Sequence, residues 1–241
     1  MHKEIHKWYS PALNKEMEIA VYGNYGYALL MFPTAAADFL EYERFHLIGS
    51  IEHHINSGKI KVFSINTVNN ESWLNSSMYP PHKSIRHGQF NNYVVSEVVP
   101  FIQEHCKGLV PIITTGASVG AYHAANTFFR RPDIFSGVIA MSGVYDLKYY
   151  TKGYYDDNVY YNSPIDYLPN VNDQTQLQQM RKSSIVIASG QGDYEDPGSS
   201  RKLSEILHSK NVPHWLDLWG YDMKHDWPTW REMLPYFISK I

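Results

Sequence analysis

Cysteine is almost absent from this sequence. The 241 residues include a single cysteine, Cys106, so no disulfide bond can form within the chain. A chain of this length buries about 70–75% of the surface that it exposes when unfolded, so it needs neither disulfides nor a structural metal. Cys106 precedes Lys107 and Gly108 at the polar end of an expected helix, which favours a structural role over a nucleophilic one.

Long apolar runs and a strong excess of one charge are also missing. No stretch approaches the ~20 apolar residues that cross a bilayer, and the first residues are polar. We therefore expect a soluble, cytoplasmic protein without a membrane partner. Lys and Arg total 21 against 24 Asp and Glu, for a formal net charge of −3. This mixed charge argues against a nucleic-acid partner, and the sequence leaves open whether the chain is a monomer or a homo-oligomer.

Groups of residues with metal-binding spacing are scarce as well. His2 and His6 have an i, i+4 spacing, but they stand at a chain end that is expected to fray. They have no third ligand nearby in the sequence, and no Cys/His cluster with metal-site spacing follows. We therefore expect no metal and no cofactor.

The most informative stretch is residues 110–130. A short β-branched run meets a Gly-Ala-Ser-Val-Gly pentapeptide with Ser118 at its centre, and a helical pattern follows at once. This order predicts a strand, a sharp strained turn that exposes the serine hydroxyl, and a helix. A Cβ atom at Gly116 or Gly120 would collide where strand and helix converge. The pentapeptide alone is a weak signal, because ordinary turns are also rich in Gly and Ser, but its context strengthens it.

Apolar and amphipathic segments alternate along the rest of the chain. We expect strands at residues 8–13, 16–22, 27–32, 60–68, 110–115, 135–142, 184–189 and 215–219. Further helices are expected at residues 41–55, 89–106, 199–210 and 227–241. The first two strands alternate as an antiparallel hairpin would, and no composition break divides the chain. The sequence therefore predicts a single α/β domain over residues 1–241, with a mostly parallel, doubly wound sheet.

Two segments stand apart from this alternation. Residues 69–87 predict a long loop, which includes Trp73 and Tyr79. Residues 149–170 carry seven tyrosines, and this aromatic content argues against disorder. We expect this tyrosine-rich excursion to cross the top of the sheet and form a pocket wall over the site, although a purely packing role fits its sequence as well.

A serine hydroxyl needs a base within hydrogen-bond reach, and that base needs an acid to orient it. In an open α/β sheet these groups lie in the loops after the strands, where ligands bind. Ser118, Asp193 and His225 each follow an expected strand, in the chain order that is typical of this serine turn. Three further acids remain open as candidates for the place of Asp193. They are Glu195, Asp196 and Asp146.

An oxyanion hole requires two N–H donors beside the serine. The Val119 N–H is the first of these, and the second is expected from the loop that follows residues 27–32. Pro33 has no N–H, which leaves Thr34 or Ala35, and we take Thr34 first. We also expect Ala35 to contact the substrate, together with the loop residues Trp73 and Tyr79.

The chain resembles the putative-esterase family of α/β-hydrolases, which includes esterase D (S-formylglutathione hydrolase) and the antigen 85 mycolyltransferases. The likeness is closest to small bacterial proteins of this family and covers nearly the whole chain. The matching stretches are LLMFPT at 29–34, GASVGA at 116–121, GQGDYED at 190–196 and the segment 214–237. The last is the most specific, because it combines His225 with a helix start that carries a proline.

The resemblance and the three side chains together predict a serine carboxylesterase. It would hydrolyse small, short-acyl esters through an acyl-enzyme intermediate. A thioesterase or an acyltransferase with the same triad is the alternative, because the sequence does not identify the acceptor. A catalytically silent binding domain is a third hypothesis, which the intact set of serine, acid and histidine disfavours.

Overall fold

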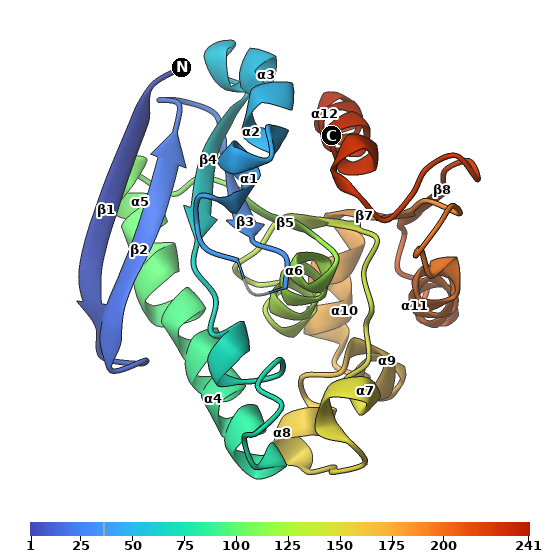
Figure 1. Cartoon of the computed structure of the whole chain (residues 1–241). Coiled ribbons are helices and arrows are strands. Elements are labelled where there is room, and N and C mark those ends of the chain that lie inside the picture. Colours follow the sequence, from blue (N-terminus) through green and yellow to red (C-terminus); the bar gives the residue numbers. More distant parts are fainter. Residues whose placement is uncertain (36) are drawn as a thin grey trace.

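The protein, as a computed structural model, is described over residues 1–35 and 37–241. Ala36, which belongs to the expected oxyanion loop, lies outside the described residues. The core is an eight-stranded sheet in the order β1-β2-β4-β3-β5-β6-β7-β8 (Figure 1). The strands are β1 (Lys3–Ser10), β2 (Lys15–Tyr22), β3 (Tyr27–Phe32), β4 (Ile60–Ile65), β5 (Ile112–Ala117), β6 (Gly137–Met141), β7 (Ser184–Ser189) and β8 (Trp215–Leu218).

The sheet is antiparallel at one edge and parallel elsewhere. β1 and β2 form an antiparallel hairpin, and β2 runs antiparallel to β4. All other neighbouring strands are parallel. The α/β fold that the sequence predicts, with a mostly parallel sheet and an antiparallel N-terminal hairpin, is confirmed.

Helices cover both faces of the sheet. One face packs against α1 (Glu41–Arg44), α2 (Leu47–Ser50), α3 (Glu52–Asn56) and α12 (Trp227–Lys240). The other packs against α4 (Pro80–Tyr93), the π-helical turn η2 (Val94–Val98), α5 (Val99–His105), α6 (Val119–Arg130), α9 (Pro164–Tyr167), α10 (Gln174–Arg181) and α11 (Pro197–Ser209). Short helices η1 (Asn69–Glu71), α7 (Lys148–Thr151), α8 (Asp157–Tyr160) and η3 (Leu168–Asn170) lie in the connections.

The central strand β3 shows why its sequence is continuously apolar. Ala28, Leu30 and Phe32 belong to the hydrophobic core on one face of the sheet. Leu29 and Met31 belong to the core on the opposite face. Because successive side chains of a strand point to opposite faces, a strand with helices on both sides must be apolar at every position.

The N-terminal half departs most from the predicted boundaries. β1 begins at Lys3 rather than at residue 8, because an edge strand is stable with half-buried, polar-rich alternation. The helix expected at 41–55 is three short helices, and His46, which separates the first two, has a left-handed backbone with φ of 62°. Further along the chain, the sequence pattern does not predict α10.

The long loop expected at 69–87 ends early. Pro80 begins α4, because proline is favoured in the first turn of a helix, and α4 continues through η2 into α5. The π-helical turn directly precedes the segment with Pro100, which lacks an N–H for an ordinary helical bond. The remaining loop therefore spans only residues 66–79.

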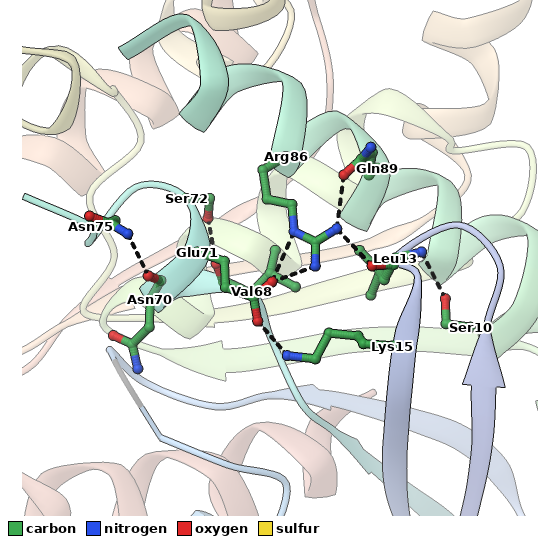
Figure 2. A network of polar contacts seen from close by, with 10 residues as sticks. All are labelled: Ser10, Leu13, Lys15, Val68, Asn70, Glu71, Ser72, Asn75, Arg86 and Gln89. Carbon is green, nitrogen blue, oxygen red and sulfur yellow. Dashed lines mark hydrogen bonds and ion pairs between the residues drawn. The ribbon is translucent and has the colours of Figure 1, made fainter. Parts of the chain in front are cut away.

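A polar network fixes this loop between the hairpin and α4 (Figure 2). The Glu71 carboxylate pairs with Lys15 and accepts the Nε–H of Arg86 at 3.0 Å. Arg86 Nη1 also donates to the Leu13 carbonyl at 2.9 Å. Burial opposes ionisation of Glu71, but the two cations outweigh it and lower the pKa of its carboxyl. The network thus positions a loop that reaches the site described below.

No helix among the described residues combines the length and the apolar character that a bilayer span requires.

Candidate active site

Ser118 occupies a strained turn between β5 and α6. Its φ of 56° and ψ of −124° are rare for a residue with a side chain, a conformation that costs about 1–3 kcal/mol. A Cβ on Gly116 would lie 2.4 Å from the Gly120 backbone, and one on Gly120 would lie 2.3 Å from the Phe32 carbonyl oxygen. The two glycines therefore let β5, α6 and the end of β3 converge beneath the serine.

A buried tyrosine holds this turn in place. The Tyr42 hydroxyl donates to the Phe32 carbonyl at 2.5 Å and accepts the Ala117 N–H at 3.0 Å. Burial raises the pKa of Tyr42, which keeps the hydroxyl protonated for this bridging role. On the other side, the Ser118 N–H donates to the Met141 carbonyl at 3.0 Å, across to β6. Hydrogen bonds to both neighbouring strands thus stabilise the strained serine.

A histidine contacts the serine hydroxyl. His225, in the loop between β8 and α12, lies with Nε2 3.0 Å from Ser118 Oγ. Its other ring nitrogen, Nδ1, lies 3.2 Å from Glu195 Oε2. The His225 backbone N–H donates to the Asp193 carbonyl at 3.0 Å, and the Trp230 ring packs edge-on against the imidazole at 5.2 Å. The ring is thereby fixed between a hydroxyl and a carboxylate.

The acid beside the histidine is Glu195, and the prediction that Asp193 fills this place is wrong. The Asp193 side chain is 67% exposed and pairs with Lys224 at 2.7 Å. Only its backbone carbonyl reaches His225, because the loop turns its side chain toward solvent. The remaining two acids make local contacts instead. Asp196 accepts the Gly198 N–H at the start of α11, and Asp146 accepts the Lys148 N–H.

The Glu195 carboxylate is enclosed by donors. Its side chain is only 1% exposed, and Oε1 accepts the Ser142 hydroxyl at 2.6 Å and the Gly190 N–H at 3.2 Å. Burial opposes its ionisation, but the hydrogen bonds from His225, Ser142 and Gly190 outweigh burial and lower its pKa. Trp230 Nε1 donates in turn to Ser142 Oγ at 3.0 Å. A continuous hydrogen-bonded chain therefore runs from Trp230 to the serine.

Sequence reasoning missed Ser142 and Trp230. Ser142 follows β6 directly, so its position at the carboxyl edge of the sheet was a usable signal. Its left-handed φ of 55° is not visible in the sequence. Trp230 lies in the first turns of α12, where no spacing rule relates it to the end of β6.

The structure differs from the predicted oxyanion hole at one of its two donor residues. Val119 opens α6, so its N–H has no partner within the helix. The Thr34 N–H, however, donates to Glu41 Oε2 at 2.7 Å, and the Thr34 hydroxyl donates to Glu41 Oε1 at 2.6 Å. This bidentate contact engages the donor that the sequence assigned to the oxyanion hole. The contact with Glu41 involves the Thr34 N–H, so Ala35 remains the candidate for the second oxyanion donor.

Ala35 is held through its carbonyl. Asn69 Nδ2 donates to the Ala35 oxygen, and Asn69 Oδ1 lies 2.7 Å from His123 Nε2. Burial lowers the pKa of His123 to about 3, so the ring is neutral and donates its N–H to Asn69. His123 also stacks on Phe32 at 6.0 Å. The buried histidine and asparagine therefore brace the loop after β3.

The predicted substrate contacts lie in different surroundings. Trp73 is 1% exposed and packs with Tyr122, close to Val119. Tyr79 is 65% exposed and lies edge-on against His82. Ala35 is exposed in the loop after β3. The tyrosine-rich excursion contributes to the same buried group as Trp73, whose other members are Leu147, Val159, Tyr150 and Tyr154.

Comparison with known proteins gives consistent matches. The model of the putative esterase family matches residues 10–239. A ferulic acid esterase structure is 17% identical, with a TM-score of 0.77 over 99% of this chain and 98% of that one. The S-formylglutathione hydrolase of Staphylococcus aureus is 17% identical, with a TM-score of 0.71 over 100% and 99%.

A third solved structure extends the range of relatives. The protein MPT51 of Mycobacterium tuberculosis is 14% identical, with a TM-score of 0.74 over 100% of this chain and 98% of that one. A comparison with curated proteins gives no match. At these identities the structures establish the shared fold, whereas the family model spans nearly the whole sequence. The chain belongs to the putative esterase family, and it is an ester-hydrolysing enzyme of the α/β-hydrolase fold.

Proposed function

We propose that the chain is a serine carboxylesterase with Ser118 as nucleophile, His225 as general base and Glu195 as the orienting acid. The observation that carries this proposal is the position of the His225 ring. Nε2 lies 3.0 Å from the serine hydroxyl, and Nδ1 lies 3.2 Å from a carboxylate that is sequestered from solvent. This geometry suits proton transfer from a hydroxyl to an imidazole whose tautomer is fixed.

The reaction would proceed in two halves. Ser118 Oγ attacks the ester carbonyl while its proton moves to His225 Nε2, and Glu195 stabilises the imidazolium that forms. The N–H groups of Val119 and Ala35 hold the oxyanion. His225 then protonates the leaving alcohol, which gives an acyl-enzyme on Ser118. A water molecule, deprotonated by His225, attacks this ester and releases the acid.

We further propose that the acyl group is short. The support is the packing beside Val119, where Trp73 and Tyr122 are 1% and 2% exposed. The Val119 side chain packs against this group, so we expect little room beside the proposed oxyanion donor for a long alkyl chain. The excursion over residues 149–170 contributes to this packed group, which fits both roles that its sequence allows, a pocket wall or a packing cover.

The test is hydrolysis of p-nitrophenyl esters from acetate to long acyl chains by wild type, Ser118→Ala and Ser96→Ala. Ser96 is exposed on η2 and serves as the matched serine control. Short esters should be preferred, and Ser118→Ala should lower kcat by at least about 10³-fold. Absence of turnover, together with absence of labelling of Ser118 by a fluorophosphonate, would overturn the proposal.

The same assay identifies the acceptor and the acyl class. Methyl ferulate and S-formylglutathione join the panel because neighbours in structure are named for these substrates. Added alcohols or thiols test for transfer, since an acyltransferase would give new esters or thioesters in place of the free acid. A preference for long acyl chains would contradict the short-acyl proposal and leave the serine mechanism intact.

A further inference from the structure

A second cluster of reactive side chains lies at the opposite edge of the sheet from β8. Glu4 and His6 belong to the edge strand β1, and His105 is the last residue of α5. The helix α5 lies beside β1 (Figure 1). The carboxylate and the two imidazoles offer one ligand atom each within 4.8 Å of one another. His2, on the segment that leads into β1, contacts the other oxygen of Glu4 at 2.6 Å.

The spacing of these atoms fits a tetrahedral metal site. Glu4 Oε2 lies 2.9 Å from His6 Nε2 and 3.1 Å from His105 Nε2. Ligand atoms at Zn–N and Zn–O distances of about 2.0–2.2 Å lie roughly 3.3–3.5 Å apart in a tetrahedron. Small side-chain shifts of a few tenths of an ångström would therefore admit an ion between them. His6 and His105 both present Nε2 toward the same oxygen of Glu4, Oε2, as converging ligands do.

The ligand side chains are held by packing. The His6 ring lies edge-on to Phe101 at 5.1 Å and to His105 at 5.2 Å. His105 also packs against Phe63 at 5.8 Å, and its side chain is only 16% exposed. Lys61 Nζ donates to the His105 carbonyl at 3.1 Å, which fixes the end of α5 against β4. Such support reduces the entropy lost when an ion is bound.

We propose that Glu4, His6 and His105 bind a divalent transition-metal ion, with His2 holding the other oxygen of Glu4. Two imidazoles and one carboxylate form a donor set that suits Zn²⁺ and its neighbours in the first transition row. In the sequence, His2 and His6 lacked a third ligand. The fold brings His105, about a hundred positions along the chain, to Glu4 and His6. The pairing of β1 with β2 also orders this N-terminal segment, for which the sequence predicts fraying.

The bound ion would join the edge strand to the helical layer. β1 pairs with β2 alone, so its outer side has no neighbouring strand among the residues of the described sheet. A metal held by both β1 and α5 binds only the folded arrangement and therefore stabilises it by mass action. The site shares no residue with the proposed triad, so this inference is independent of the proposed function.

The experiment is titration of untagged, metal-free protein with Zn²⁺, followed by calorimetry and by thermal unfolding. One equivalent should bind with a micromolar or lower Kd. At a 100-fold excess over Kd, Tm should rise by about 5–10 °C. The variants Glu4→Gln and His6→Ala should each weaken binding at least about 10-fold and abolish most of the Tm rise.

Two control variants test whether Zn²⁺ binds at this cluster and not at another histidine. His53→Ala, at an exposed histidine on α3, should bind Zn²⁺ as wild type does. His225→Ala should also bind Zn²⁺ as wild type does. If the ion bound at the proposed triad, this variant would lose it. His105→Ala tests the third ligand. If this variant fails to fold, Glu4→Gln and His6→Ala carry the test, because the side chains of Glu4 and His6 are more exposed than that of His105. No binding by wild type, or binding that only His225→Ala removes, would overturn the proposal.

Discussion

The two sides of Ser118 are built differently. On the base side, one buried carboxylate gathers His225, Ser142 and Gly190, so a single group organises the end of β6, the loop after β7 and the loop before α12. On the side of the proposed oxyanion hole, the loop after β3 is held at separate points: Glu41 binds Thr34, and Asn69 binds the carbonyl of the next residue.

This difference indicates how each side tolerates change. In the proposed mechanism, the base side depends on charge, because the Glu195 carboxylate stabilises the imidazolium that forms on His225. The oxyanion side depends on position, because neutral N–H donors act only when they point at the place where charge develops. We therefore expect large losses from isosteric charge removal on the first side, and smaller losses from removal of a brace on the second.

The largest effect should come from Glu195→Gln. This change preserves shape but removes the negative charge beside His225 Nδ1, so kcat should fall by about 10³–10⁴-fold. Asp193→Asn removes only an exposed ion pair with Lys224, and should change kcat by less than about fivefold. Steady-state kinetics on a short p-nitrophenyl ester measures both variants. A greater loss in Asp193→Asn than in Glu195→Gln would restore Asp193 as the acid.

The choice between these acids shows where sequence reasoning stops. Ser118 and His225 follow strands, and parallel strands end at one edge, so their neighbourhood could be predicted. Asp193 and Glu195 stand two residues apart in one loop, and both satisfy that rule. The decision depends on the Gly192 N–H, which bonds to Met223, and on Ser142, which donates to Glu195. Such contacts between distant loops leave no periodic signal.

For the fold, too, the sequence predicts some elements correctly and others not. The predicted bounds of β3 and β7 agree with the structure, because each strand is a short apolar run whose ends are marked by turn residues. The segment 41–55 has helical periodicity, yet the left-handed His46 divides it. Thr34 lost its expected role for a related reason, since its partner Glu41 lies on the first of these short helices. Local pattern thus predicts the buried sheet better than the loops that shape the site.

The next largest effect should come from Asn69→Ala, which tests the oxyanion side. Loss of the amide removes the donor that holds the Ala35 carbonyl, so the loop becomes less well positioned and kcat should fall by about 10–100-fold. Asn70→Ala, at the exposed neighbouring position, is the matched control and should behave as wild type. Circular dichroism establishes that both variants are folded. A folded Asn69→Ala enzyme with unchanged kcat would show that the brace does not position the oxyanion hole.

A smaller effect is expected from Trp230→Phe. The ring that packs on His225 is largely retained, but the Nε1–H donor to Ser142 is lost. One neutral hydrogen bond contributes about 0.5–1.5 kcal/mol, so kcat should fall by about 2–12-fold. Trp227→Phe is the control, because Trp227 stacks on Phe45 at 4.4 Å. Equal losses in the two variants would mean that aromatic packing, not the hydrogen-bonded chain, supports the base side.

The smallest effect concerns acid stability. Because the folded state lowers the pKa of Glu195 below its value in the unfolded chain, ionised Glu195 favours folding at neutral pH. That contribution is complete above the unfolded value of about 4.3 and is lost as the pH falls through the lowered folded value. Protonated glutamate resembles glutamine, so the Tm difference between wild type and Glu195→Gln should be greatest near pH 7, should narrow as the pH falls below the unfolded value of about 4.3, and should close once the pH has passed the lowered folded value. For a chain of this size, each kcal/mol corresponds to about 2–4 °C in Tm. A difference that stays constant across this range would mean that the carboxylate gains nothing from its donors on folding, and that the hydrogen bonds from Ser142 and Gly190 only offset the cost of burying it.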